Sequence, residues 1–131
     1  MFVGEVDTGK VEALHRIADG IQGAGARAFD FVVDEIHYWK HSSIVYASTG
    51  KIPRELIDLV TILQDTLSAA GFSLERRTYR PHITLMRDAS CKALPKLSQA
   101  IAWPVREWVL VKSEQASDGS VYIPIGRWPL A

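Results

Sequence analysis

Residues 77–90 of the chain read RTYRPHITLMRDAS, and this stretch decides how the rest of the sequence is interpreted. A proline is followed at once by His-Ile-Thr, and residues 82–86 predict a strand. Pro81 has no amide hydrogen to give to a sheet, so His82 should open the strand or lie near an edge. Because side chains alternate along a strand, His82 and Thr84 should face the same side, about 7 Å apart.

These residue types suit chemistry at a phosphate. An imidazole can move a proton near neutral pH, and a threonine hydroxyl can donate a hydrogen bond to a phosphate oxygen. Arg77, Arg80 and Arg87 could offset phosphate charge through forked contacts. In a flat strand Arg87 has the opposite parity to His82, so it needs a bulge or the strand end to reach the same face. His-x-Thr alone is a short pattern that also occurs in ordinary strands with one polar edge histidine.

Two helices are predicted before this stretch. The first spans roughly residues 10–21, with apolar residues at helical spacing and Thr8 as its N-cap. Three glycines are expected to end it: Gly20, Gly23 and Gly25. The second begins after Pro53, carries an apolar stripe over residues 56–70 and stops at Gly71.

Short strands occupy most of the remaining sequence. Residues 35–42 are expected to form a long hairpin loop, residues 117–120 a turn, and Phe2 and Val3 the end of a strand. The other predicted strands cover residues 28–34, 43–48, 82–86, 105–113 and 121–125. A helix, two strands, a helix and three more strands predict an α+β domain with a mostly antiparallel sheet.

Length and composition fit one globular domain. The chain has 131 residues, 47% of them hydrophobic, and its 15 basic and 15 acidic residues cancel. A net basic face for nonspecific nucleic-acid binding is therefore not indicated. The single cysteine, Cys91, excludes an intrachain disulfide and fits a reduced, cytoplasmic setting. Apolar runs stay below 18 residues, so we predict no membrane-spanning helix and no membrane partner.

The opening stretch resembles the second signature of the 2H phosphoesterases, and specifically of the bacterial 2′-5′ RNA ligase family, also described as RNA 2′,3′-cyclic phosphodiesterases. That signature is an arginine, a few residues, Pro-His-Ile/Leu-Thr-Leu, and an arginine five residues after the histidine. The chain has this arrangement from Arg77 to Arg87. The flanks are similar too, in Leu67 to Gly71, Ser113, Tyr122 and Trp128 to Leu130. The resemblance implies antiparallel sheets with two main helices packed outside.

The first signature of the family is only partly present. It reads H-x-T-L-x-F-L/V-G-E-V/I, and residues 2–6, FVGEV, match its tail. The His-x-Thr-Leu part would lie before Met1. We therefore expect a single domain over residues 1–131 that lacks an N-terminal strand and helix. An internal methionine start, a truncation, or a natural short relative would each explain this. Exposed edges in such a chain would favour aggregation or an element-swapped homodimer.

None of the other histidines lies in a His-x-Thr context. His15 lies beside the apolar stripe of the first helix and reads as a boundary residue. The spacing of His37 and His41 would suit a metal pair on a helix, but that region is expected to be a loop and lacks a completing carboxylate or cysteine. We predict no metal site and no other cofactor.

The resemblance implies a mechanism without metal. Two histidines act as general base and general acid on the 2′,3′-cyclic phosphate of an RNA or nucleotide and leave a 2′-phosphate. Here His82 would take one of these roles, Thr84 would bind the phosphate and Arg87 would stabilise its charge. Phe2 would stack on a base or serve as a core residue, and Arg77 is a weaker substrate contact.

Two rival interpretations stay open. A non-catalytic nucleotide- or RNA-binding module would keep His82 and Thr84 as a phosphate pocket without turnover. A related 2H enzyme would use the same residues on another cyclic phosphate or phosphodiester.

Overall fold

The computed structural model describes residues 1–24, 26–75 and 77–131. Two helices and seven strands follow one another along these residues, and the paired strands run antiparallel, which confirms the predicted α+β class. The elements are α1 Thr8–Gly23, β1 Phe29–Val33, β2 Glu35–Trp39, β3 Ile44–Ser48, α2 Arg54–Ala69, β4 Ile83–Met86, β5 Ile101–Val105, β6 Glu107–Ala116 and β7 Gly119–Pro129.

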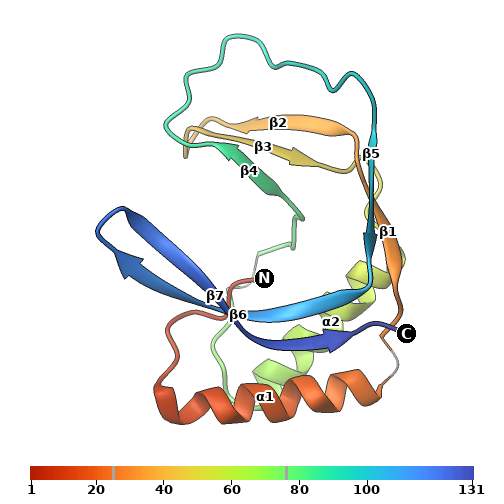
Figure 1. Ribbon diagram of the computed structural model, residues 1–131, viewed down its shortest axis with the longest axis vertical. Coiled ribbons are helices and arrows are strands. Elements are labelled where there is room, and N and C mark those ends of the chain that lie inside the picture. Colours follow the sequence, from red (N-terminus) through yellow and green to blue (C-terminus); the bar gives the residue numbers. More distant parts are fainter. Residues whose placement is uncertain (25, 76) are drawn as a thin grey trace.

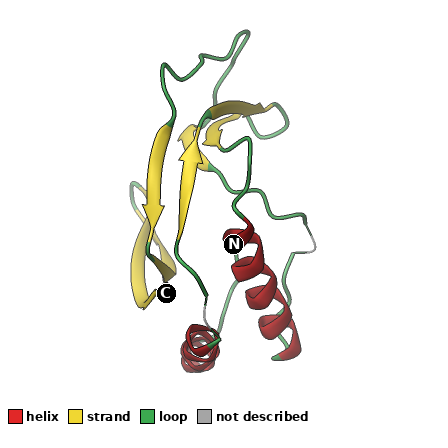
Figure 2. Ribbon diagram, turned by 90° about the vertical axis from the view of Figure 1, so that its right-hand side faces the viewer, coloured by secondary structure: helices red, strands yellow, loops and turns green. Residues whose placement is uncertain are grey.

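The strands form three small sheets, β1–β5, β2–β3–β4 and β6–β7. Figure 1 shows β2–β4 at one end of the molecule and the β6–β7 hairpin at the other, with β1 and β5 running between them. The hydrophobic core lies where β1 meets β3, around Phe29, Phe31, Val33 and Ala47. Both helices lie at the hairpin end, away from the β2–β4 sheet (Figure 2).

Helix α2 matches its prediction closely. Pro53 is its N-cap, and Gly71 follows the helix with a φ of 88°, a conformation that favours glycine. Leu59, Val60 and Leu67 are its buried residues. Neither helix of the described residues is long and apolar enough to cross a lipid bilayer.

Helix α1 differs from its prediction at both ends. Asp7, with extended dihedrals, is the N-cap, and Thr8 is already helical. At the other end α1 runs through Gly20 to Gly23, because its buried stripe of Leu14, Ala18 and Ile21 outweighs the modest helix penalty of glycine. Gly25 lies outside the described residues.

The prediction of a loop over residues 35–42 is wrong. Residues 35–39 form β2, which pairs with β3 so that Glu35 faces Ser48 and Trp39 faces Ile44. Ile36, Tyr38 and Trp39 are good strand formers, and the polar residues among them hid this preference. Only residues 40–43 form the turn.

Two further differences concern β5 and the first residues. Strand β5 was not predicted, because Pro104 weakens the strand signal; in the structure Pro104 pairs with Asp30 of β1. Phe2 and Val3 lie outside any strand. Gly4, with a φ of 94°, turns the backbone away from an extended path directly after them.

The β6–β7 hairpin turns at residues 117–118, inside the predicted turn, and Gly119 has a φ of 122°. Near the other end of β7, Trp128 is buried and its Nε1 donates a hydrogen bond to Asp19 Oδ1 of α1 at 2.8 Å. Its indole lies over Gly126, where a Cβ atom would collide with the ring. Trp128 thus fastens the hairpin to α1.

The residues after β7 return to the beginning of β1. The Ala28 amide donates to the Ala131 carbonyl at 2.8 Å, and the Ala131 amide donates to the Ala26 carbonyl at 2.9 Å. Strand β1 pairs with β5 from Phe29 opposite Val105 to Val33 opposite Ile101. Strand β1 and the residues just before it are therefore bonded to β5 and to the end of the chain, which lie far away in sequence.

Candidate active site

One face of the β2–β3–β4 sheet gathers the polar and aromatic residues of the candidate site. His37 of β2 is the register partner of Tyr46 of β3, and Tyr46 is the partner of Thr84 of β4. Side chains of register partners lie on the same face of a sheet. His82 lies two residues before Thr84 and so shares this face by alternation.

His82 is exposed and held in a defined orientation. Its Nδ1 lies 2.9 Å from the carbonyl oxygen of Arg80. A carbonyl can only accept, so Nδ1 carries the hydrogen and Nε2 is left to exchange a proton with a ligand. The imidazole makes edge-type contacts with Trp39, at a centroid distance of 4.8 Å, and with Tyr46, at 6.0 Å.

The residue before His82 is anchored from the neighbouring strand. Pro81 is buried, and its carbonyl accepts a hydrogen bond of 2.6 Å from the buried Ser48 hydroxyl. This bond satisfies the buried Pro81 carbonyl, whereas the proline nitrogen has no hydrogen to give to the sheet. It fixes the point at which the chain enters β4.

A β-bulge gives Arg87 the parity it needs. Tyr46 pairs with Thr84, but its neighbour Val45 pairs with Met86, so β4 carries one extra residue at position 85. After such an insertion, the residue following Met86 returns to the face of Thr84. Arg87 is that residue. The register of β3 and β4 therefore supplies the bulge that Arg87 needs to share the face of His82.

The loop after β4 is tied back to the β2–β3 hairpin. Ala89 is buried, its amide donates to the Ser43 carbonyl at 2.9 Å, and its carbonyl accepts from the Tyr38 hydroxyl at 2.8 Å. Asp88, between this anchor and Arg87, has a φ of 52° and turns the chain. The backbone at Arg87 is therefore constrained on both sides.

The other two predicted substrate residues lie apart from this face. Phe2 is 71% exposed and lines a cavity with Val111 and Ser113 of β6. The exposed guanidinium of Arg77 lies 3.6 Å from the carboxylate of Glu75. Among the described residues the structure records no contact that joins either one to His82, and their roles stay predictions.

Sequence reasoning missed three aromatic residues of the site: His37, Trp39 and Tyr46. His37 stacks on Tyr46 at a centroid distance of 5.4 Å, and Trp39 lies 4.0 Å from Tyr46. The Nε2 of His37 bonds to the Glu35 carboxylate at 2.7 Å. The alternation of Glu35, His37 and Trp39 was the available signal, because every second residue of a strand faces the same way.

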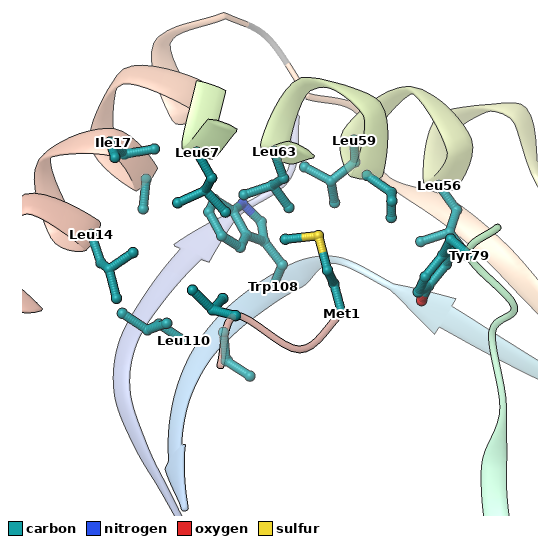
Figure 3. A pocket seen from close by; sticks show the side chains of 14 residues that line it. Met1, Leu14, Ile17, Leu56, Leu59, Leu63, Leu67, Tyr79, Trp108 and Leu110 are labelled. Carbon is teal, nitrogen blue, oxygen red and sulfur yellow. The ribbon is translucent and has the colours of Figure 1, made fainter. Parts of the chain in front are cut away.

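An apolar cavity lies elsewhere. It has a volume of about 200 Å³ and lies between α1, α2 and β6 (Figure 3). Its lining is almost wholly apolar and includes Met1, Leu14, Leu63, Leu67, Tyr79 and Trp108. Burial raises the pKa of the Tyr79 hydroxyl above its ordinary value of 10.0. His82 and Thr84 do not line this cavity.

A metal centre was not predicted. Over residues 1–24, 26–75 and 77–131, no three His, Cys, Asp or Glu side chains gather as ligands for one ion.

His15, read as a boundary residue, is half-buried beside Trp128 at a centroid distance of 5.7 Å.

Comparison with known proteins bears on the same residues. A sequence profile described as LigT-like phosphoesterase matches residues 48–122, more than half of the chain and inclusive of His82 and Thr84. The chain belongs to the LigT-like phosphoesterase family. The RNA 2′,3′-cyclic phosphodiesterase of Escherichia coli strain K12 is similar to this phosphoesterase, with 33% identity over 130 residues, covering 98% of this chain and 72% of the relative.

Solved structures show the same LigT-like fold. Escherichia coli LigT complexed with 3′-AMP superimposes with a TM-score of 0.89 at 30% identity, covering 100% of this chain and 74% of that one. A Thermus thermophilus protein gives a TM-score of 0.79 at 22% identity, covering 99% of this chain and 75% of that one, which bears on the fold alone. The resemblance to the 2H phosphoesterases and the fold that it implied are confirmed.

Proposed function

We propose that this LigT-like phosphoesterase hydrolyses 2′,3′-cyclic phosphates of RNA or nucleotides to 2′-phosphates. The observation that carries the proposal is the placement of His82 and Thr84 on one sheet face, with Nδ1 of the imidazole bonded to a backbone carbonyl and Nε2 left for substrate. The related Escherichia coli protein, named an RNA 2′,3′-cyclic phosphodiesterase, supports the choice of substrate.

The proposed reaction requires two proton transfers. A water oxygen forms a bond to phosphorus while the bond from phosphorus to the ribose 3′ oxygen breaks. Water gives up a proton, and the 3′ oxygen takes one. Nε2 of His82 is suited to one of these transfers, because an imidazole exchanges protons near neutral pH.

The phosphate itself would be held by neighbouring groups. The Thr84 hydroxyl donates to a phosphate oxygen, and Arg87, on the same face by the bulge, offsets the charge. Phe2 and Arg77 would contact the nucleotide farther from the phosphate. Both need a substrate that extends toward β6 or toward the loop before β4.

A second candidate function follows from one observation. His82 to Thr84 is the single His-x-Thr of the 131 residues, so the chain supplies one of the two histidines that the family resemblance implies. A nucleotide-binding protein without turnover would use the same phosphate pocket. Catalysis and binding must therefore be measured separately.

The test compares His82→Ala with wild type on adenosine 2′,3′-cyclic phosphate, with phosphorus NMR to identify the product. We expect a 2′-phosphate and a loss of rate on the order of 10²- to 10⁴-fold, the usual contribution of one proton-transfer group. His41→Ala, in the exposed turn after β2, is the matched control and should keep the wild-type rate.

Three outcomes separate the candidates. Near-full turnover by His82→Ala would remove this residue from the mechanism. A 3′-phosphate product would move the enzyme to another class of phosphodiesterase. Binding of adenosine 2′-phosphate by a wild-type chain without turnover would favour the binding protein.

A further inference from the structure

Three rings on the site face form a continuous surface beside His82, and we call Tyr46, Trp39 and His37 the aromatic shelf. Tyr46 is only 7% exposed and forms the floor. Trp39 and His37 are half-buried and lie against it at centroid distances of 4.0 and 5.4 Å. We propose that the aromatic shelf binds the nucleobase of the nucleotide whose phosphate lies at His82 and Thr84. This inference rests on the proposed function.

The position of Trp39 carries the proposal. Its ring centroid lies 4.8 Å from that of His82. A phosphate at His82 and Thr84 therefore places the rest of its nucleoside within reach of the indole. Stacking on an aromatic face accepts any base, since every base presents a π face.

His37 gives the aromatic shelf a polar edge. Its Nε2 donates to the Glu35 carboxylate at 2.7 Å, which fixes the ring in a stacked pose on Tyr46. Among the described residues Nδ1 makes no hydrogen bond, so it stays available to a base edge or to the ribose. The Glu35 pair thus orients an aromatic ring whose second nitrogen has no partner among the described residues.

An aromatic cluster can also serve only to stabilise a sheet, and a nucleobase-dependent readout separates the two roles. Calorimetry would compare the binding of adenosine 2′-phosphate with that of ribose 2-phosphate, which lacks the base. Trp39→Leu keeps apolar bulk but removes the indole face, and His37→Ala removes the second ring. Trp103→Leu is the matched control, because Trp103 of β5 is 53% exposed and lies outside the β2–β3–β4 sheet.

For Trp39→Leu we expect the Kd for adenosine 2′-phosphate to rise roughly 5- to 150-fold, the range that loss of one base–aromatic stack produces. His37→Ala should show a smaller rise of the same kind. The Kd for ribose 2-phosphate should stay at its wild-type value in both variants, and Trp103→Leu should match wild type with both ligands.

Equal losses for both ligands would mean that the rings only support the fold, and would overturn the proposal. Unchanged affinity for adenosine 2′-phosphate in Trp39→Leu would overturn it as well. A fall in kcat without a change in Kd for His37→Ala would make His37 a proton-transfer group instead of part of a base site. Nucleobase-dependent binding by a wild-type chain that hydrolyses no cyclic phosphate would uphold the aromatic shelf and overturn the hydrolase.

Discussion

At the scale of single residues, the orientation of one imidazole depends on groups from two strands and from the segment before β4. The Arg80 carbonyl holds Nδ1, and Trp39 of β2 and Tyr46 of β3 make edge-type contacts with the ring. Ser48 of β3 sets the entry to β4 through the Pro81 carbonyl. A general acid or base needs such fixed geometry before its pKa matters.

Ser48→Ala tests the anchor before His82. Removal of the hydroxyl leaves the buried Pro81 carbonyl without its partner, which should lower the free energy of unfolding by about 1–3 kcal/mol. Urea unfolding measures the change. Ser42→Ala, in the exposed turn after β2, should leave the midpoint unchanged. An unaltered midpoint for Ser48→Ala would show that another donor, such as water, replaces the hydroxyl.

At the scale of elements, the sequence predicted individual helices and strands from local patterns but did not predict which strands pair. Helix α2 and strands β1, β3 and β4 were predicted because apolar spacing, Pro53 and Gly71 act over a few residues. Strand β5 was missed, because its proline is tolerated only through pairing with a distant strand.

The same division applies to the site. The shared face of His82 and Thr84 follows from alternation within one strand, so the sequence was enough to predict it. Tyr46 reaches that face only because β3 pairs with β4, and His37 only because β2 pairs with β3. No local pattern encodes those registers. The sequence showed that Arg87 needs a bulge or the strand end to reach the face of His82. It did not show that the bulge lies at position 85.

Two glycines test how the β6–β7 hairpin is fastened to α1. Gly126→Ala forces a methyl group against the Trp128 indole and should break its bond to Asp19, at a cost of about 1–3 kcal/mol for overpacking. Gly20→Ala meets nothing within 4 Å, and in the interior of α1 it should stabilise by about 0.5–1 kcal/mol. Thermal unfolding of both variants should therefore move in opposite directions. A neutral Gly126→Ala would mean that Trp128 repacks without strain.

At the scale of the whole molecule, helices and hairpin surround an apolar cavity that buries Tyr79. Burial raises the pKa of the Tyr79 hydroxyl above 10.0, so the folded state favours the protonated form. Below pH 10 the hydroxyl is protonated in both folded and unfolded chains, and this contribution is fully present. As the pH rises through the folded pKa it is lost, because the unfolded chain ionises first.

Tyr79→Phe should remove this loss. We expect the unfolding free energy of wild type to fall more steeply above pH 10 than that of the variant, with parallel curves at lower pH. Urea titrations across that range measure the difference between the two proteins, in which the other tyrosines and lysines cancel. Parallel curves above pH 10 as well would mean that Tyr79 ionises in the folded protein as it does in water.

The pairing of β1 with β5 also governs how the molecule can fold. Phe29 meets Val105, and Ala28 meets Ala131, so most of the chain must be gathered before these bonds form. The entropy of closing so long a loop is lost before the contacts repay it, which slows folding relative to helical proteins. Helix α2 and the β2–β3 hairpin can form on the shorter timescale of local structure. During synthesis on the ribosome, Phe29 and Phe31 stay exposed until residues 101–105 emerge and can pair with β1. A stalled chain would present both side chains to chaperones or to other nascent chains.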